Sequence, residues 1–418
     1  MTSSTVSARP VAAAAPWAEP LFTVGVTGTN GKTSTCRLIA AALRQVSRPV
    51  AEITTLGVHL DDEALPRGKR FADFLAALET SAARGSRFAV LEATSHGLAQ
   101  GYARAWRFDL GVFTNLSPDH LSTHGSWENY LAAKAQLFMH LGPGRTAVLN
   151  AADPHALFLD QAIPGDVERR WFSAPSRGER LCPSDLEAAS VSLGPTGTTI
   201  ELVPSPAATA LGGALRTRLI GEVFAENALA AALAALAAGV PGAEVAAGIA
   251  ACPQVPGRFE VIAHGPDRPT VAVDYAHTAD ALTHTCRSAR LLAGEGGRVI
   301  AVFGAGGGAT PSKRVPMGEA VGRAVDLAVV TNDNPRREDP QEIADSLVEG
   351  LRLGGHARVL VDLDRRAAIA RAIAEAAPGD VVIITGKGHE EGQRIGDRTH
   401  PFSDRAVARA CTDRHSSL

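Results

Sequence analysis

A glycine-rich loop near the start of the chain has the residue types of a phosphate-binding site. It reads GTNGKT over residues 28–33, after the apolar run LFTVGV and before the helical stretch STCRLIAAALRQ. In such a strand–loop–helix context, backbone N–H groups point at phosphate oxygens, the lysine reaches the β and γ phosphates, and the hydroxyl ligates Mg2+. We therefore expect a nucleoside triphosphate site made by Gly28, Thr29, Asn30, Gly31, Lys32, Thr33 and Ser34.

Three later side chains could serve a metal bound beside this loop. Glu92 ends the apolar run FAVLEAT, and His120 follows the run FDLGVFTN. Open α/β sheets bind ligands at the carboxyl ends of their strands. Taken alone, however, such a glutamate is more often a surface residue and such a histidine a turn residue. Lys134, in YLAAKAQLF, taken alone is more often a lysine whose stem lies on apolar surface while its ammonium reaches water.

The elements that must position these residues follow an α/β pattern. Apolar strands alternate with helical stretches such as 71–83 and 128–141, which predicts a mostly parallel sheet covered on both faces. Alternating short runs at 179–220 predict antiparallel strands at its edge, and 226–240 predicts a buried helix. The pattern restarts after the Pro/Gly-rich linker 252–262, in five strand-then-loop units: TVAVDYAH, RVIAVFGAGGG, LAVVTND, ARVLVD and DVVIITGKGHE.

We therefore expect an α/β protein with a disordered tail and two domains. The tail covers 1–20, a P-loop ATP-binding domain 21–258, and a Rossmann-like domain 259–418. The formal net charge of -3 argues against a nucleic-acid partner. No apolar run reaches the roughly 18 residues of a membrane span. Five scattered cysteines without a CxxC pair indicate a reduced, cytoplasmic protein.

Eight motifs, in order and at compatible spacing, resemble those of the Mur ligases. The resemblance is greatest to the UDP-N-acetylmuramoyl-tripeptide synthetases, which add the third amino acid of the peptidoglycan stem peptide. It implies ATP-dependent amide-bond formation: a carboxylate attacks the γ phosphate to give an acyl phosphate, and an amine then displaces phosphate, leaving ADP. The motifs are VTGTNGKTS, LEATSHGL, GVFTNLSPDHLSTHGSWENYLAAKAQLF, VLNAADP, GRFE, VDYAHTADAL, VVTNDNPRREDP and GDVVIITGKGHE.

The resemblance also implies roles at the ATP end of the site. Thr33 and Glu92 would hold a first Mg2+, and Glu92 with His120 a second. Lys134 matches a lysine that the family carbamylates with CO2; apolar burial favours the neutral amine that CO2 requires. The catalytic set is then Lys32, Glu92, His120 and Lys134. Asn227 matches a residue that helps seat adenine, and Arg258, Asp274 and His277 match residues facing the nucleotide. Asp274 and His277 could equally be plain caps and turns.

At the other end, the resemblance implies an amino-acid site in the Rossmann-like domain. Asp333, Asn334 and Arg336 match the specificity motif, whose arginine accompanies meso-diaminopimelate and can grip its distal carboxylate bidentately. Gly386 and Glu390 match groups that contact the far end of that amino acid. A solvated arginine in a polar loop is the alternative for Arg336.

The sequence departs from the family pattern in three places. About 20 residues precede the strand that leads into the phosphate loop, too few for the family's UDP-binding domain, since domains usually need roughly 50 or more. The expected TTP segment is replaced by Pro66-Arg67-Gly68-Lys69-Arg70, a basic cluster that could bind an acidic acceptor or be a solvated charge run. Ala309, within the loop 306–310, replaces an arginine that would grip the α-carboxylate. Losing such a charge-assisted pair costs about 1.5–3 kcal/mol.

Three hypotheses remain open. The departures favour an ADP-forming ligase that joins an amino acid to a small or carrier-linked carboxylate in a specialised pathway and binds UDP-N-acetylmuramoyl-dipeptide poorly. The second is a muropeptide ligase that adds meso-diaminopimelate in peptidoglycan synthesis. The third is an inactive nucleotide-binding partner. The intact residues Lys32, Thr33, Glu92, His120 and Lys134 argue against the third.

Overall fold

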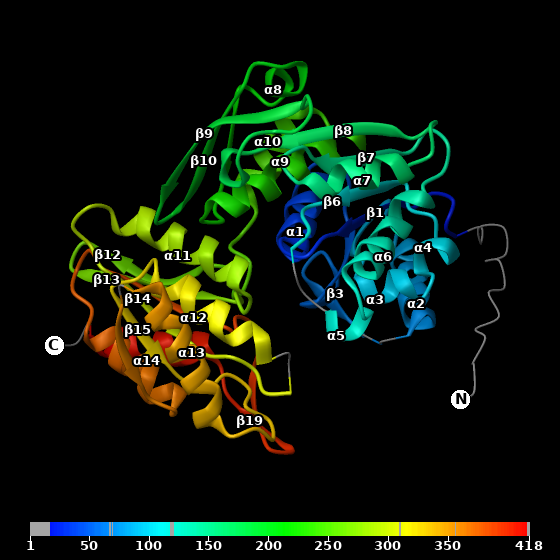
Figure 1. Cartoon of the computed structure of the whole chain (residues 1–418). Helices are drawn as coiled ribbons and strands as arrows, with labels where there is room; N and C mark the ends of the chain where they lie inside the picture. The colour runs from blue at the N-terminus through cyan, green and yellow to red at the C-terminus, as the bar shows by residue number, and fades with distance from the viewer. Residues whose placement is uncertain are drawn as a thin grey trace, which may run out of the picture. The chain divides into compact units, whose positions relative to one another are not determined.

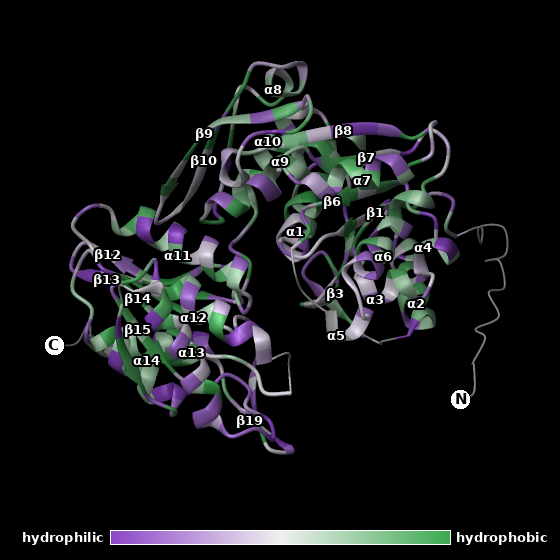
Figure 2. Ribbon diagram, in the orientation of Figure 1, coloured by the Kyte–Doolittle hydropathy of each residue, from purple (hydrophilic) through white to green (hydrophobic). Residues whose placement is uncertain are grey.

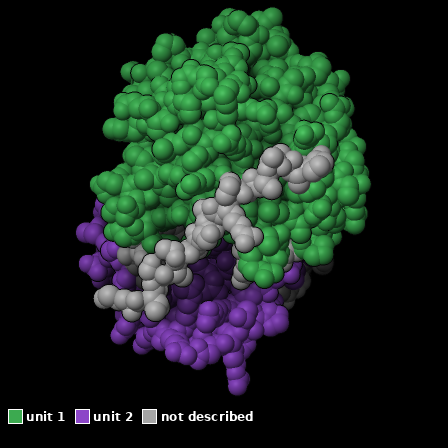
Figure 3. Space-filling view, turned by 90° about the vertical axis from the view of Figure 1, so that its right-hand side faces the viewer, with its two compact units in different colours: residues 1–191, 199–217, 223–252 green, residues 192–198, 218–222, 253–418 purple. Residues whose placement is uncertain are grey.

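The computed structural model describes residues 17–66, 68, 70–117, 121–308, 311–355 and 357–415. They form two compact units, coloured separately in Figure 3 and shown as ribbons in Figure 1. Unit 1 comprises residues 1–191, 199–217 and 223–252, and unit 2 comprises 192–198, 218–222 and 253–418. Each unit is an α/β structure around one large sheet, so the predicted fold class is confirmed.

The strand before the glycine loop is an interior strand of the sheet of unit 1. β1 (Phe22–Thr27) pairs in parallel with β5 (Phe88–Glu92) and β6 (Leu110–Phe113). Parallel pairing continues to β2 on one side and to β7, β8 and β9 on the other. The remaining strands extend the two ends of the sheet: β2 (Val50–Thr54), β3 (Gly57–Leu60), β4 (Glu63–Leu65), β7 (Thr146–Asn150), β8 (Glu168–Ser173), β9 (Leu186–Gly194), β10 (Gly197–Leu202) and β11 (Ala214–Thr217).

The predicted edge strands are present but not all antiparallel. β9 runs parallel to β8, whereas the two-residue connection from β9 to the neighbouring β10 makes that pair an antiparallel hairpin. At the opposite end, β3 is antiparallel to both β2 and β4. The parallel centre of the sheet therefore carries antiparallel additions at both ends.

The helices of unit 1 begin where the sequence supplies capping groups or apolar faces. α6 (Trp127–Met139) starts at Ser126, whose hydroxyl accepts a hydrogen bond from Asn129 N at 3.2 Å. α9 (Glu222–Ala237) is rich in alanine and leucine, and most of its residues are buried. The others are α1 (Lys32–Leu43), α2 (Phe71–Ala83), α3 (Ser95–Ala99), α4 (Tyr102–Ala105), α5 (Leu121–His124), α7 (Pro154–Ala162), the 3-10 turn Pro175–Arg177, α8 (Pro206–Ala210) and α10 (Gly242–Ala251).

Unit 2 contains the five strands predicted for it, in a doubly wound arrangement. Its sheet has the order β12-β13-β17-β14-β15-β16, parallel except for the antiparallel edge strand β12. The strands are β12 (Glu260–Gly265), β13 (Arg268–Asp274), β14 (Val299–Phe303), β15 (Leu327–Val330), β16 (Arg358–Val361) and β17 (Val381–Thr385), with a separate hairpin of β18 (Gly392–Ile395) and β19 (Arg398–Pro401). The helices are α11 (Ala279–Ala293), α12 (Arg314–Gly322) after the turn Pro311–Lys313, α13 (Pro340–Gly354), α14 (Arg365–Ala374) and α15 (Asp404–His415).

The apolar residues lie where two layers meet. The strands β14, β15 and β17 are buried along their whole length, as expected for a parallel sheet covered on both faces. Figure 2 shows the apolar character of α9 and the polar character of β8, whose first residues are the more exposed ones. Among the described residues, none of the helices is both long and apolar enough to traverse a lipid bilayer.

Helices α12 and α13 approach each other closely through glycines. A Cβ atom on Gly318 of α12 would lie 2.2 Å from the carbonyl oxygen of Leu347 in α13. Conversely, a Cβ atom on Gly350 of α13 would lie 2.1 Å from the carbonyl oxygen of Val315. Only glycine permits this approach of two backbones. Because α12 follows the loop after β14 and α13 follows the loop after β15, the contact holds these two loops beside each other.

We expect the substitution Gly318→Ala to destabilise unit 2 by about 1–3 kcal/mol, since the new methyl group meets backbone atoms that cannot move aside separately. Gly296→Ala is the matched control, because no heavy atom lies within 4 Å of its added Cβ and its backbone is not left-handed. It should change the free energy of unfolding by less than about 1 kcal/mol. Urea unfolding measures both. Equal effects of the two substitutions would contradict a glycine-dependent helix contact.

Candidate active site

The glycine loop between β1 and α1 has a shape that depends on two of its glycines. Gly28 and Gly31 have φ angles of 151° and 87°. A Cβ atom on Gly28 would lie 1.9 Å from the hydroxyl of Thr114, and one on Gly31 would lie 2.4 Å from Oδ1 of Asn227. The loop therefore fits between the segment after β6 and helix α9 only without side chains at these positions.

The segment after β6 fixes the loop by hydrogen bonds. Thr29 N donates to Asn115 O at 2.8 Å, and Asn30 N donates to Asn115 Oδ1 at 3.0 Å. The Thr114 hydroxyl donates to Asn30 O at 2.7 Å. The N-cap residue of α1, which starts at Lys32, is Gly31, and it has no side chain that could cap this N terminus. The N–H groups of its first turn can therefore receive a phosphate.

Two lysine ammonium groups meet at one carbonyl oxygen of this loop. Lys32 Nζ donates to Gly28 O at 3.0 Å and to Thr29 O at 2.8 Å, while Lys134 Nζ donates to Gly28 O at 2.7 Å. Lys134 is only 1% exposed and lies 4.4 Å from the centroid of the Tyr130 ring. The alternative of a lysine that reaches water is therefore wrong. The hydroxyl of Tyr130 lies 3.1 Å from that of Thr29, so α6 contacts the loop at two successive residues.

A threonine that the sequence did not single out joins the two expected metal ligands. The Thr55 hydroxyl lies 3.2 Å from the Thr33 hydroxyl, and Thr55 N donates to Glu92 Oε1 at 3.1 Å. Glu92 Oε2 is buried without a hydrogen-bond partner among the described residues. An unsatisfied carboxylate oxygen beside a hydroxyl fits Mg2+, which often takes one or two protein ligands and completes its shell with phosphates and water. The hydroxyl-bearing segment ITTLG at the end of β2 was the available signal for Thr55.

The second expected metal site is only partly described. His120 lies outside the residues that the structure describes, as do Arg67 and Lys69 of the basic cluster. Over the described ranges, no group of three or more His, Cys, Asp and Glu side chains has the arrangement of a metal site. Arg70, the described cationic residue of that cluster, is at the N terminus of α2 and pairs with Asp73 at 3.1 Å.

A serine–histidine contact near Lys134 was also missed from the sequence. His124 Nε2 lies 3.0 Å from the hydroxyl of Ser95. Burial, and after it the positive charges of Lys134 and His96, lower the pKa of His124. His124 is therefore neutral at physiological pH and can hold Ser95 as a hydrogen-bond donor or acceptor. The SHG and THG segments carry these residues but have no spacing that predicts their contact.

Asn227 lies against the loop, beside Gly31. It is 1% exposed, and its Nδ2 has no hydrogen-bond partner among the described residues. A buried amide without a partner is uncommon and points to a group that a ligand can satisfy. The neighbouring Glu226 accepts a hydrogen bond from the Ser176 hydroxyl at 2.5 Å, which fixes this turn of α9.

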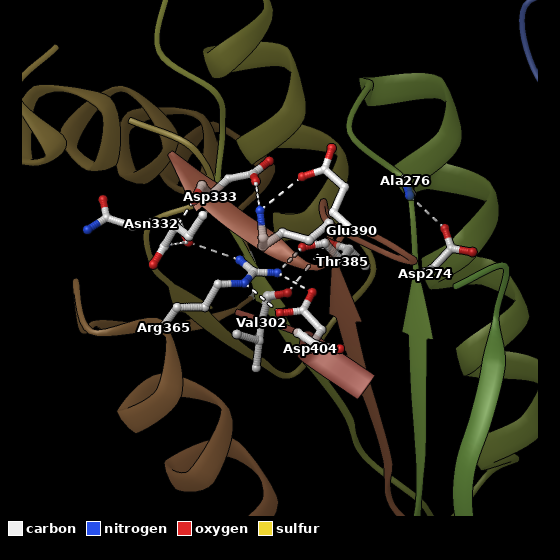
Figure 4. A network of polar contacts seen from close by, with 12 residues as sticks. Asp274, Ala276, Val302, Asn332, Asp333, Arg365, Thr385, Glu390 and Asp404 are labelled. Carbon is white, nitrogen blue, oxygen red and sulfur yellow. Dashed lines mark hydrogen bonds and ion pairs between the residues drawn. The ribbon is translucent and has the colours of Figure 1, made fainter. Parts of the chain in front are cut away.

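In unit 2, the three residues expected to face the nucleotide lie around the loop that contains Tyr275. The Arg258 guanidinium lies 4.4 Å from the Tyr275 ring centroid, and His277 Nδ1 lies 2.7 Å from Tyr275 O. The Asp274 carboxylate accepts hydrogen bonds from Phe259 N, Ala276 N and the Thr285 hydroxyl at 2.6, 2.8 and 3.1 Å. Figure 4 shows the Asp274–Ala276 bond. These three bonds fix the shape of the loop. Asp274 therefore acts as a capping residue, which is the alternative role expected for it.

The loops after β15 and β17 bring the expected amino-acid residues together. Asn334 Nδ2 donates to Glu390 Oε2 at 3.1 Å. A Cβ atom on Gly386 would lie 3.1 Å from Asp333 Oδ2, so this glycine lies directly against the 333–336 loop. Arg336 is exposed, has a φ of 55°, and is fixed by a hydrogen bond from its N–H to Arg394 O at 3.0 Å.

The glycine loop after β14 packs on the same residues. Gly307 N donates to Asn334 O at 2.9 Å, and a Cβ atom on Gly307 would lie 1.9 Å from Pro335 O. Gly308 N donates to the carboxylate of Glu338. Ala309 and Thr310, where the sequence departs from the family pattern, lie outside the described residues.

A buried ion pair lies beneath these loops, at the ends of the strands β15 and β17. Arg365 and Asp404 are fully buried and 2.7 Å apart, and Arg365 also donates to Asn332 O and Thr385 O at 3.1 and 2.8 Å (Figure 4). One guanidinium thus holds the ends of both β15 and β17. Burial raises the pKa of Asp333 against the opposing charges of Arg365 and Lys387. Sequence reasoning missed Arg365, Asp404 and Lys387; only Lys387, within GKGHE, stood in a motif.

Comparison with known proteins matches both units to one family. Residues 26–235 match the Mur ligase middle domain, and residues 257–388 match the Mur ligase glutamate ligase domain. UDP-N-acetylmuramoyl-L-alanyl-D-glutamate--2,6-diaminopimelate ligases are similar over most of the chain. The one from Thermosynechococcus vestitus is 39% identical over 93% of this chain and 76% of its own. That from Streptomyces coelicolor is 38% identical over 93% and 75%.

Solved structures agree. A structure of a UDP-N-acetylmuramoyl-L-alanyl-D-glutamate--2,6-diaminopimelate ligase has a TM-score of 0.67 at 34% identity, covering 95% of this chain and 79% of that one. A folylpolyglutamate synthase from Mycobacterium tuberculosis, at 22% identity and a TM-score of 0.68 over 88% of each chain, shares the fold. The chain belongs to the Mur ligase family of ATP-dependent acid–amino-acid ligases.

Proposed function

We propose that the chain joins meso-diaminopimelate to UDP-N-acetylmuramoyl-L-alanyl-D-glutamate, with ATP converted to ADP and phosphate. The observation that carries this proposal is the 37–39% identity, over at least 93% of the chain, to ligases named for that reaction. It favours the second of the three hypotheses. Ala309 in place of an arginine favours the first hypothesis, a ligase for a small or carrier-linked acid. That ligase is the second candidate function.

The ATP end of the proposed reaction uses the residues gathered at the glycine loop. The loop amides and Lys32 would bind the triphosphate, and Asn227 the adenine. Thr33 and Glu92, with His120, would hold Mg2+, which offsets the repulsion between the triphosphate and an approaching carboxylate. Lys32 supplies a further positive charge where the γ phosphoryl group is transferred to the carboxylate and ADP leaves. In unit 2, Arg258, Asp274 and His277 are proposed to contribute to the nucleotide site.

Lys134 is proposed to act as a carbamate. Its burial favours the neutral amine, which is the form that reacts with CO2. The hydrogen bond from Lys134 Nζ to Gly28 O favours the ammonium instead, so this bond must weaken when the carbamate forms. The reaction releases two protons from the ammonium nitrogen and leaves a singly negative group in place of a cation. Such a group would serve as a carboxylate-like ligand close to Thr33 and Glu92.

The amino-acid end is proposed to bind diaminopimelate through residues of unit 2. Arg336 and Asn334 supply N–H donors suited to the distal carboxylate, and Glu390 an acceptor for the distal ammonium. Asp333 and Gly386 shape the floor of this region, since both lie in the packed loops after β15 and β17.

Turnover measured over a matrix of acids and amines tests the function. ADP formation with UDP-N-acetylmuramoyl-L-alanyl-D-glutamate and meso-diaminopimelate together, and not with either alone, is the expected result. Turnover confined to small acids would instead support the second candidate. Isothermal titration calorimetry of the muramyl nucleotide, with a non-hydrolysable ATP analogue present, gives the corresponding affinity.

We expect Lys32→Ala to lower kcat by several orders of magnitude, on the order of 10³-fold, because a positive charge beside the γ phosphate is lost. Ion-exchange chromatography of the wild-type products separates ADP and phosphate from AMP and pyrophosphate. It therefore shows which phosphate bond of ATP breaks. Formation of AMP by the wild type would rule out the acyl-phosphate route.

We expect Lys134→Ala to be nearly inactive and to regain part of its activity with added short carboxylic acids, because these can replace the carbamate as an anionic ligand. Mass spectrometry of carbon-13 carbamate trapped on the wild-type protein measures the modification directly. Ordinary activity of the Lys134→Ala variant would show that this lysine has only a structural role.

We expect Arg336→Lys to lower the preference for meso-diaminopimelate over L-lysine by roughly tenfold to a hundredfold, since a lysine lacks the two parallel N–H donors that bind a carboxylate. The ratio of the two kcat/KM values measures it. The neighbouring Arg337→Lys is the control: Arg337 pairs with Asp397 at 2.8 Å and should leave the ratio unchanged. An unchanged ratio in both variants would remove Arg336 from the site.

A further inference from the structure

Lysine is a rare residue in this chain, and the lysines it has are unevenly placed. Only five of its 41 basic residues are lysines: Lys32, Lys69, Lys134, Lys313 and Lys387. Arginine therefore serves nearly everywhere that a surface cation is enough. Lys32 and Lys134 belong to the phosphate loop region. Lys387, in unit 2, is fully buried and has no role in the function proposed above.

The ammonium group of Lys387 lies among three polar side chains. Its Nζ donates to Asn334 Oδ1 and to Glu390 Oε2, both at 3.0 Å, and lies 3.6 Å from Asp333 Oδ1. Two of these partners, Asp333 and Glu390, are carboxylates, and both are labelled in Figure 4. A compact ammonium can donate three hydrogen bonds in different directions, which a planar guanidinium cannot do in so small a space.

The backbone around Lys387 holds the ammonium in place. Gly386 and Gly388 on either side have φ angles of 112° and 52°. A Cβ atom on Gly388 would lie 2.8 Å from Gly257 O, so this loop is packed against its surroundings. The lysine stem therefore starts from a fixed point, and the ammonium position is set by the fold.

Lys387 decides which atoms of Asn334 face the site. Asn334 Oδ1 accepts hydrogen bonds from Lys387 and from Arg394 N, the latter at 2.9 Å. With its oxygen so engaged, the amide presents Nδ2 to Glu390 Oε2. Over the described residues, Glu390 Oε1 and the second N–H of Asn334 make no further hydrogen bond. One acceptor and one donor are thus left for a substrate.

Lys387 also fixes the charge of Glu390. Partial burial raises the pKa of this carboxyl, but the hydrogen bond and charge of Lys387 and the hydrogen bond from Asn334 outweigh it, so the pKa is lowered. Glu390 therefore stays ionised across the neutral range. An ionised Glu390 is the form that can accept a hydrogen bond from a substrate ammonium.

We propose that Lys387 is a positioning residue for the amino-acid substrate: it orients Asn334 and Glu390 so that one donor and one acceptor point at the distal end of the incoming amino acid. The inference rests on the proposed function, since it takes Asn334 and Glu390 as substrate contacts. It assigns no contact between Lys387 and the substrate.

A double-mutant cycle on the full chain tests this coupling. Lys387→Met and Glu390→Gln are made singly and together, and KM for meso-diaminopimelate and kcat are measured. If Lys387 acts through Glu390 and Asn334, each single change should raise KM about tenfold, with kcat changed much less. The double variant should be no worse than the more affected single variant, because coupled residues are not additive.

A control variant and a second substitution of Lys387 distinguish a lost orientation of Asn334 and Glu390 from a loss of fold. Arg298→Met removes a cation paired with Asp380 at the opposite end of β17, at 2.6 Å, and should leave KM unchanged. Lys387→Gln keeps N–H donors for Asn334 and Glu390 but lacks the charge, so it should lie between wild type and Lys387→Met. Unfolding midpoints and the affinity for an ATP analogue show that each variant is folded.

Two results overturn the proposal. One is a pair of KM effects that multiply in the double variant, which marks independent residues. The other is a fall in kcat of the same size in both single variants, with KM unchanged. A crystal structure of the Lys387→Met variant gives a readout without turnover: the Asn334 amide and the Glu390 carboxylate should move from their present contacts, and unmoved side chains contradict the proposal. Absence of turnover in the wild type would count against the proposed function alone.

Discussion

The two ammonium groups at the carbonyl oxygen of Gly28 impose the main physical constraint on unit 1. Lys32 Nζ and Lys134 Nζ each bond to that oxygen, so the two nitrogens lie within about 6 Å of each other. At an effective dielectric constant of about 20, two like charges at that distance repel by about 3 kcal/mol. Either a bound anion or the loss of one positive charge relieves this repulsion. A triphosphate supplies the first and a carbamate on Lys134 supplies the second.

The same constraint explains why the loop is held so firmly by other groups. The bonds from Thr29 and Asn30 to Asn115, and from Thr114 to Asn30, would hold the loop even when the two cations push apart. β1 is an interior strand of the sheet and pairs with β5 and β6 on its two sides. The sheet thus provides a rigid support for a loop whose electrostatics favour a ligand.

Unit 2 holds its buried cations in ion pairs. Arg365 is balanced by Asp404, and Lys387 by Glu390 and Asp333. Removing one partner of such a pair is costly, because it leaves a buried charge alone. These pairs join the ends of β15 and β17, which is where an open α/β sheet binds its ligands. Stability and site geometry therefore depend on the same few side chains.

Local patterns in the sequence were sufficient to predict helices and strands. They were not sufficient to predict which polar side chains pair between them. The run LFTVGV, the glycine loop and the alternation of strands and helices predicted β1, α1 and the five strands of unit 2, because each leaves a periodic or turn-forming signature. Arg365 and Asp404 are 39 residues apart, and Thr55 and Glu92 are 37 apart. No periodicity links such pairs. The hypothesis of a small or carrier-linked acid depended on the basic cluster and Ala309. The similarity of 93% of the chain to diaminopimelate ligases favours the other acceptor.

The contact of Gly31 with Asn227 restricts how this chain can change over generations. A methyl group at position 31 would meet the amide oxygen of a residue almost two hundred positions away, in another helix. A shorter side chain at 227 would remove this clash but would leave a gap against the loop. It would not remove the strain that a φ of 87° imposes on any residue other than glycine. Position 31 is therefore restricted to glycine by two separate constraints, and only one of them involves position 227.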